Sequence, residues 1–247
     1  MNRQIRSHKL YLPQISLNFL PVVGILLVLW SSPCRAQLTP LMVAIQGGDV
    51  AKAGQMITKE TDINQQNADG ASLLMLAIPT GKLELIQLIL DHKANIEITD
   101  NQGLTPLMWA IRYGDVDIVD ILLANGANVN SKGNRDETAL SIAALEGNLP
   151  IIRRLLRNKA NIDATNRNGE TALITACFEG NKAIIQTLLD AGANINAQSK
   201  EGFTPLAAAA MNGFSNVVAL LIKSGAKIET DQSDFIPLDT DSVIEEP

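Results

Sequence analysis

Apolar residues recur along the chain with a helical spacing that restarts at regular intervals. In residues 105–126, two apolar stripes with the i, i+3, i+4 spacing of a helix face follow one another. The stripes are Leu107, Ala110 and Ile111, then Ile118, Val119, Leu122 and Leu123. Thr105 and Asp115 are expected to cap the two helices, and Gly114 and Gly126 to end them. Neither helix can bury its stripe alone, so the pattern predicts a helix pair that packs against neighbouring pairs.

This pattern repeats every 33 residues, which predicts a stack of six such units. Four positions keep their residue type: a Thr or Ser, a Leu two residues later, an Ala five later and a Gly nine later. The first two sets are Thr39, Ser72, Thr105, Thr138, Thr171 and Thr204, and Leu41, Leu74, Leu107, Leu140, Leu173 and Leu206. The other two are Ala44, Ala77, Ala110, Ala143, Ala176 and Ala209, and Gly48, Gly81, Gly114, Gly147, Gly180 and Gly213. The small Ala allows neighbouring helices to approach closely.

At these positions the chain resembles the ankyrin repeat family. Thr-Pro-Leu at residues 39–41, 105–107 and 204–206 resembles the start of the family's repeat. Gly-Ala-Asn-Val-Asn at 126–130 and Gly-Ala-Asn-Ile-Asn at 192–196 resemble its end. The resemblance covers residues 37–230 and implies an all-α ankyrin repeat solenoid, in which helix-turn-helix pairs are joined by β-hairpin-like loops. Six repeats are expected at about 37–66, 67–99, 100–132, 133–165, 166–198 and 199–230.

The chain departs from the family at one position of the repeat. Where the family has His after Thr-Pro-Leu, this chain has Met42, Met75, Met108, Ser141, Ile174 and Ala207. In the family that His hydrogen-bonds between the loops of adjacent repeats, so its absence bears on the stiffness of the stack and not on the fold.

Residues 1–36 have the order of basic, apolar and small residues that a secretory signal peptide needs. Four basic or titratable residues, Arg3, Arg6, His8 and Lys9, precede an apolar run at 19–30. The run is shorter than the roughly 20 residues that span a bilayer. Cleavage is expected after Ala36, which sends residues 37–247 to the periplasm or outside the cell. The alternative is a lipid anchor on Cys34.

The C-terminal residues 231–247 are expected to form a cap and an acidic tail. Seven acidic residues and no basic residue follow Lys227. Phe235, Ile236 and Leu238 are candidates to cover the open apolar side of the last repeat.

Charge and composition exclude several function classes. The chain has 20 basic and 26 acidic residues, and the net charge of −6 argues against nucleic acid as a partner. The residues that follow Ala36 include a single Cys and a single His, which are too few for a disulfide framework or an ordinary metal site. No known catalytic spacing occurs. The sequence therefore predicts a non-enzymatic protein without cofactor or metal.

The remaining chemically reactive side chains have structural interpretations. Cys177 occupies a first-helix position that is Ile or Ala in the other repeats, so a core role is expected. His92 lies at the end of a second helix, where a cation is favourable. Asn recurs at one loop position, which favours turn formation over ligand binding. These residues are Asn95, Asn128, Asn161 and Asn194.

The resemblance implies that loop tips and the inner sides of the first helices form a concave face that binds another protein. Its partner-binding residues here are Leu104, Arg112, Tyr113, Arg135, Glu137, Leu145, Glu146, Arg167, Glu170, Phe178, Glu179, Phe203 and Met211. Arg112, Tyr113, Phe178 and Phe203 are the expected anchors, because aromatics and Arg dominate interface energies. For Phe178 and Phe203, mutual packing across one repeat boundary is an equal alternative.

The predicted function is that of a protein–protein interaction module that is monomeric alone and meets the membrane only through its signal segment. Two alternatives remain: an inhibitor or immunity-type protein for an exported basic enzyme, and a small-molecule binder. The scaffold cannot decide among them, because function lies in the surface.

Overall fold

A computed structural model describes residues 38–228, and residues 39–228 belong to one compact unit. The predicted signal peptide with Cys34, and the predicted cap and tail at 231–247, lie outside the described residues.

Residues 38–228 form six pairs of helices. The first helices are α2 (Pro40–Gln46), α4 (Leu73–Ala77), α6 (Pro106–Tyr113), α8 (Ala139–Leu145), α10 (Ala172–Glu179) and α12 (Pro205–Met211). The second helices are α3 (Val50–Met56), α5 (Leu83–Asp91), α7 (Val116–Ala124), α9 (Leu149–Arg157), α11 (Lys182–Asp190) and α13 (Ser215–Lys223). A 3-10 helix, η2 (Ile78–Thr80), follows α4, because Pro79 has no N–H to continue the α-helix.

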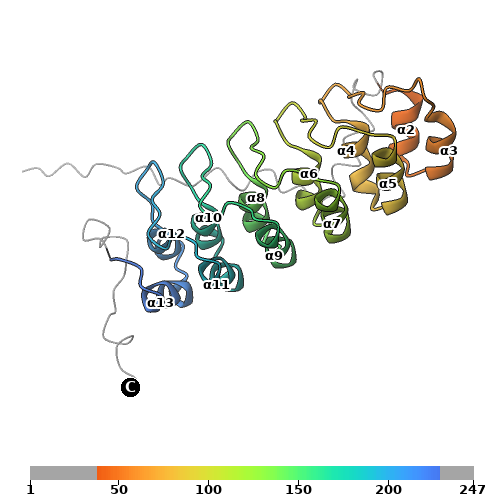
Figure 1. Ribbon diagram of the computed structural model, residues 1–247. Coiled ribbons are helices and arrows are strands. Elements are labelled where there is room, and N and C mark those ends of the chain that lie inside the picture. Colours follow the sequence, from red (N-terminus) through yellow and green to blue (C-terminus); the bar gives the residue numbers. More distant parts are fainter. Residues whose placement is uncertain (1–37, 229–247) are drawn as a thin grey trace, which may run out of the picture. The chain divides into compact units, whose positions relative to one another are not determined.

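Successive pairs stack, with first helix against first helix and second against second. In Figure 1 the first helices lie between the projecting loops and the second helices. The described residues contain no β-strand; isolated bridges such as Gln66–Ser72 and Lys132–Thr138 close the stems of three loops. The predicted all-α repeat solenoid is confirmed.

The helix ends follow the sequence. In every first helix the repeated Thr or Ser accepts the backbone N–H three residues on, at 3.1–3.4 Å. Asp115 likewise caps α7, and Gly114 ends α6 in the left-handed conformation, as predicted. Lys82 and Phe214 stand at the start of α5 and α13 without a side-chain cap.

The core consists of the two stripes and the repeated Ala. Leu107, Ala110 and Ile111 are at most 1% exposed, and the second-helix residues Ile118 and Leu122 are fully buried. The side chains that replace the family's His are buried too: Met42, Met75, Met108, Ser141, Ile174 and Ala207. They fill the core instead of joining the loops.

Hydrogen bonds to backbone, carboxamide and carboxylate oxygens join adjacent loops instead. At one position in each loop a side-chain oxygen accepts a backbone N–H of the next loop, at 2.7–2.9 Å. The acceptors are Asn64, Glu97, Asn130, Asp163 and Asn196. At four of these five boundaries the loop tips add a backbone bond, for example from the Arg167 N–H to the Arg135 carbonyl at 2.9 Å. Every boundary between described loops is therefore bridged.

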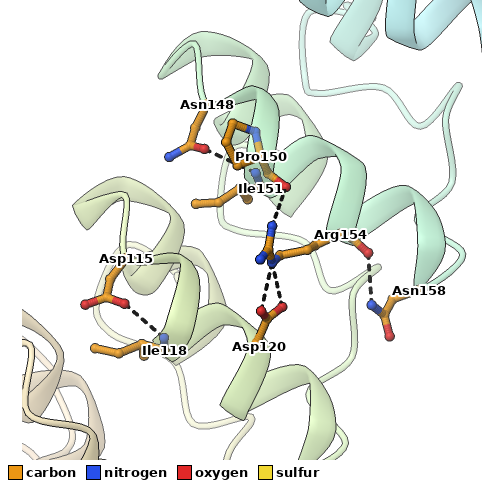
Figure 2. Close-up of polar contacts among 8 residues, drawn as sticks. All are labelled: Asp115, Ile118, Asp120, Asn148, Pro150, Ile151, Arg154 and Asn158. Atoms are coloured by element: carbon orange, nitrogen blue, oxygen red, sulfur yellow. Dashed lines mark hydrogen bonds and ion pairs between the residues drawn. The ribbon is translucent and has the colours of Figure 1, made fainter.

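The second helices of repeats three and four are joined by an ion pair. Arg154 Nε on α9 lies 2.8 Å from both carboxylate oxygens of Asp120 on α7 (Figure 2). It is the only ion pair between residues 38–228, and both side chains are partly exposed. The stack therefore depends on apolar packing and hydrogen bonds far more than on ion pairs.

Candidate partner-binding surface

The face of the first helices that points away from the core is formed by the seventh and eighth residues after each N-cap. We call it the first-helix face. Its seventh positions are Gln46, Pro79, Arg112, Leu145, Phe178 and Met211, and its eighth positions are Gly47, Thr80, Tyr113, Glu146, Glu179 and Asn212. These positions lie at the helix ends, where every one of these residues is exposed or half-buried.

Two large apolar side chains on this face are open to solvent. Leu145 on α8 is 42% exposed and Met211 on α12 is 40% exposed, while Phe178 on the intervening α10 is half-buried. Since the three occupy the same position in consecutive repeats, they form a row, here called the apolar row. Burial of such side chains is worth about 25 cal/mol per Å² of apolar surface. The apolar row is thus a surface that gains free energy when a partner covers it.

The predicted aromatic anchors are already packed against other rings. The Phe178 and Phe203 ring centroids are 5.9 Å apart at an interplanar angle of 76°, an edge-to-face contact across one repeat boundary. Tyr113 stacks on Trp109 with a centroid distance of 6.1 Å, and Trp109 Nε1 donates to Asp100 at 2.8 Å. The mutual packing weighed for Phe178 and Phe203 is confirmed, although both rings keep a partly exposed side.

The prediction that Leu104 contacts a partner is wrong. Its side chain is 2% exposed. Its backbone N–H donates to the buried Asp100 carboxylate at 2.9 Å, and its carbonyl accepts the Asp100 N–H at 3.1 Å. These two bonds turn the loop stem inward, so the side chain joins the core.

Four predicted contact residues at the loop tips also bind within or between the loops. Glu137 accepts the Arg135 N–H at 2.7 Å, and Glu170 accepts from the Asn166 side chain at 2.7 Å. The Arg167 guanidinium reaches the preceding loop's Asn134 carbonyl at 3.4 Å. Because these bonds hold the loops in shape, a substitution here would disturb the loop as well as any contact.

Charges on the first-helix face interact from helix to helix. Partial burial raises the pKa of Glu146, the Arg112 guanidinium lowers it, and the Glu179 carboxylate raises it further. Burial also raises the pKa of Glu179 and, with an opposing effect of Arg112, that of Tyr113. Neither Glu146 nor Glu179 forms an ion pair with another described residue, although the Arg112 charge acts on Glu146. The two carboxylates are therefore partly desolvated and available to a cation.

The structural interpretations of Cys177, His92 and the loop Asn residues are confirmed. Cys177 is fully buried, and burial raises the pKa of its thiol far above the ordinary value, so the thiolate is not accessible. His92 Nδ1 is 2.8 Å from the Leu88 carbonyl at the end of α5. The side chain of each repeated loop Asn accepts the backbone N–H two residues on, which forms a turn.

Neither a metal-ligating cluster nor a membrane-spanning helix is found among residues 38–228. Residues 38–228 contain no group of three or more His, Cys, Asp or Glu placed to hold a metal ion. None of the helices in this range is both long enough and apolar enough to cross a bilayer.

Two features of the surface were not predicted from the sequence. Val43 on α2 is 49% exposed although it continues an apolar run, because no repeat of the described chain precedes α2. The Arg154–Asp120 pair joins residues 34 positions apart. The 33-residue period places α7 and α9 side by side, and this period is the sequence signal from which the pair could have been predicted.

Residues 38–228 thus form a repeat solenoid whose first-helix face carries solvent-exposed apolar side chains. The sequence matches the family described as ankyrin repeats (3 copies) over residues 41–133 and again over residues 140–234. The chain belongs to the ankyrin repeat family. No curated protein matches it. Ankyrin repeats are general protein–protein interaction modules and are typically non-enzymatic.

Proposed function

We propose that this protein is a non-enzymatic interaction module that binds a protein partner through the first-helix face, in the periplasm or outside the cell. The observation that carries the proposal is the apolar row, in which Leu145 and Met211 are each at least 40% exposed beside half-buried aromatics. Apolar side chains that are exposed next to one another, rather than singly, mark interaction sites on protein surfaces.

The chemistry around the apolar row supports a protein partner. Arg112, Tyr113 and Phe178 lie on the same face, and interface centres favour Arg and aromatic residues. The Trp109–Tyr113 stack and the Phe178–Phe203 contact hold these rings in place before binding. A preorganised surface loses less side-chain entropy when the partner arrives.

The binding face can be tested with a matched pair of variants. Arg112→Ala with Leu145→Ala removes one Arg and one Leu from the first-helix face. Arg157→Ala with Leu83→Ala removes the same residue types from exposed positions on second helices. Protein expressed from the complete chain would serve as bait in a cross-linking pull-down from the cell envelope. A partner captured by the wild type and the second-helix variant, and lost with the first-helix variant, supports the proposal.

Equal capture by the two variants would refute the first-helix face as the binding site. Circular dichroism of both variants controls for folding. If the captured partner is an exported enzyme, an assay of that enzyme with and without this protein separates an inhibitor from a passive scaffold.

Export rests on the basic and apolar order of residues 1–36. Mass spectrometry of the protein from the envelope fraction tests it. We expect an N-terminus at Gln37. A lipid-modified Cys34 would place the protein on a membrane surface instead, and an uncleaved Met1 would refute processing.

A further inference from the structure

We propose that the partner segment that covers the apolar row is an amphipathic α-helix with basic residues along one flank, an inference that rests on the proposed function above. Its apolar stripe would lie on Leu145, Phe178 and Met211, and two of its Lys or Arg side chains would meet Glu146 and Glu179.

The spacing of the apolar row favours a helix over an extended segment. Helices α8, α10 and α12 pack side by side, and packed helix axes lie about 8–10 Å apart. The apolar row therefore advances by about this distance per residue. Positions i, i+7 and i+14 of an α-helix share one face and are about 10.5 Å apart. Side chains on one face of a strand are about 6.6 Å or 13.2 Å apart, and both distances lie further from the 8–10 Å range than the helical spacing does.

The charges beside the apolar row favour basic residues along one flank of the partner helix. Glu146 and Glu179 immediately follow Leu145 and Phe178 in sequence, so a row of two carboxylates runs beside the apolar row. Neither is paired with a cation among the described residues. Partial burial raises the pKa of Glu146 despite the opposing charge of Arg112, and repulsion from Glu179 raises it further. Burial also raises the pKa of Glu179, so both ionised carboxylates gain from an arriving cation. Partly desolvated charge pairs at interfaces contribute to both affinity and specificity.

The positive charge of Arg112 limits the basic residues of the partner helix to the two positions that face Glu146 and Glu179. It precedes Leu145 in the row of seventh positions, and its charge acts on Glu146. A Lys at the end of the partner helix over α6 would be repelled. The surface thus favours a helix with two central cations and a neutral or acidic end over α6.

Synthetic helical peptides test this inference without knowledge of the natural partner. The basic probe has about 18 residues, Leu at i, i+7 and i+14, and Lys at i+4 and i+11. An acidic probe has Glu in place of both Lys residues. A third probe keeps the Lys and Leu composition but carries a central Pro that prevents the helix. Fluorescence anisotropy with protein from the complete chain measures each affinity.

Two double variants locate the contact. Glu146→Gln with Glu179→Gln removes the two carboxylates with little change in shape. Glu84→Gln with Asp117→Asn removes the same charge from exposed positions on second helices. We expect the basic probe to bind the wild type and the second-helix variant about tenfold more tightly than the Glu146/Glu179 variant. The acidic and Pro-containing probes should bind the wild type at least about tenfold more weakly than the basic probe.

The inference is overturned if the basic probe does not bind, binds no better than the acidic or Pro-containing probe, or binds the Glu146/Glu179 variant as tightly as the wild type. That failure is distinct from failure of the proposed function. A natural partner that is lost with the Arg112/Leu145 variant but insensitive to the Glu146/Glu179 variant would leave the first-helix face as the binding site and reject a basic helix as its ligand.

Discussion

Gly180 is predicted to be far less tolerant of a side chain than its equivalents in other repeats. It ends α10 with φ +70°, and a Cβ built there would lie 2.7 Å from the Phe214 ring. Gly147 occupies the same position one repeat earlier with φ +70°, and its Cβ would lie 3.6 Å from the Asn181 amide nitrogen, an ordinary contact. The two glycines therefore share the backbone requirement and differ in what covers them.

The magnitudes follow from this difference. Gly147→Ala should cost about 1–2 kcal/mol, because an L-residue is strained in the left-handed conformation. Gly180→Ala adds displacement of a packed ring, and overpacking typically costs about 1–3 kcal/mol. We therefore expect about 2–5 kcal/mol in total for Gly180→Ala.

Urea unfolding followed by circular dichroism measures both free energies, and equal m-values would show that the unfolding transition keeps its cooperativity. Measuring Gly180→Ala in the Phe214→Ala background isolates the contribution of the Phe214 ring to the cost. With the ring removed, Gly180→Ala should cost the same as Gly147→Ala, which gives a coupling energy of about 1–3 kcal/mol. The reasoning is refuted if the two Gly→Ala variants lose the same free energy, or if Phe214→Ala leaves the cost of Gly180→Ala unchanged.

Three further predictions concern single side chains. Because Cys177 is buried and its thiol pKa is raised, a thiol reagent at about pH 8 should react with native protein at least about a hundredfold more slowly than with urea-unfolded protein; a fast native reaction would contradict the core assignment. Arg154→Ala should cost about 0.2–1 kcal/mol in urea unfolding, and the loss should shrink in about 1 M salt, where screening is strong; a larger, salt-independent loss would show that Arg154 acts mainly by packing. Folding raises the pKa of Glu146, so its carboxyl holds a proton more tightly in the folded state. The wild type should therefore lose stability relative to Glu146→Gln as pH rises from the ordinary carboxyl pKa of 4.5 through the raised value. A pH-independent difference in unfolding free energy between the two proteins would contradict this.

The sequence by itself determined the repeat, the helices and the core. Thr105 and Gly114 bracket a helix because a hydroxyl caps the first N–H groups and glycine tolerates the left-handed end. The stripe at Leu107, Ala110 and Ile111 had to be buried against neighbours because one helix pair has no core of its own. These are local requirements repeated at a fixed period, so they can be read without coordinates. The burial of Cys177 followed from its place in the same period.

Only the tertiary structure decided which surface residues are free. Leu104 and Glu137 occupy the same repeat position, yet Leu104 turns into the core and Glu137 closes its own loop. Phe178 and Phe203 are 25 positions apart, and only the packing of adjacent repeats brings their rings to 5.9 Å. The pairing of Asn130 with the Asn161 N–H in the next loop likewise depends on stacking. Repeat position determines where a backbone lies, whereas side-chain exposure depends on the particular neighbours across each boundary, and those differ from repeat to repeat.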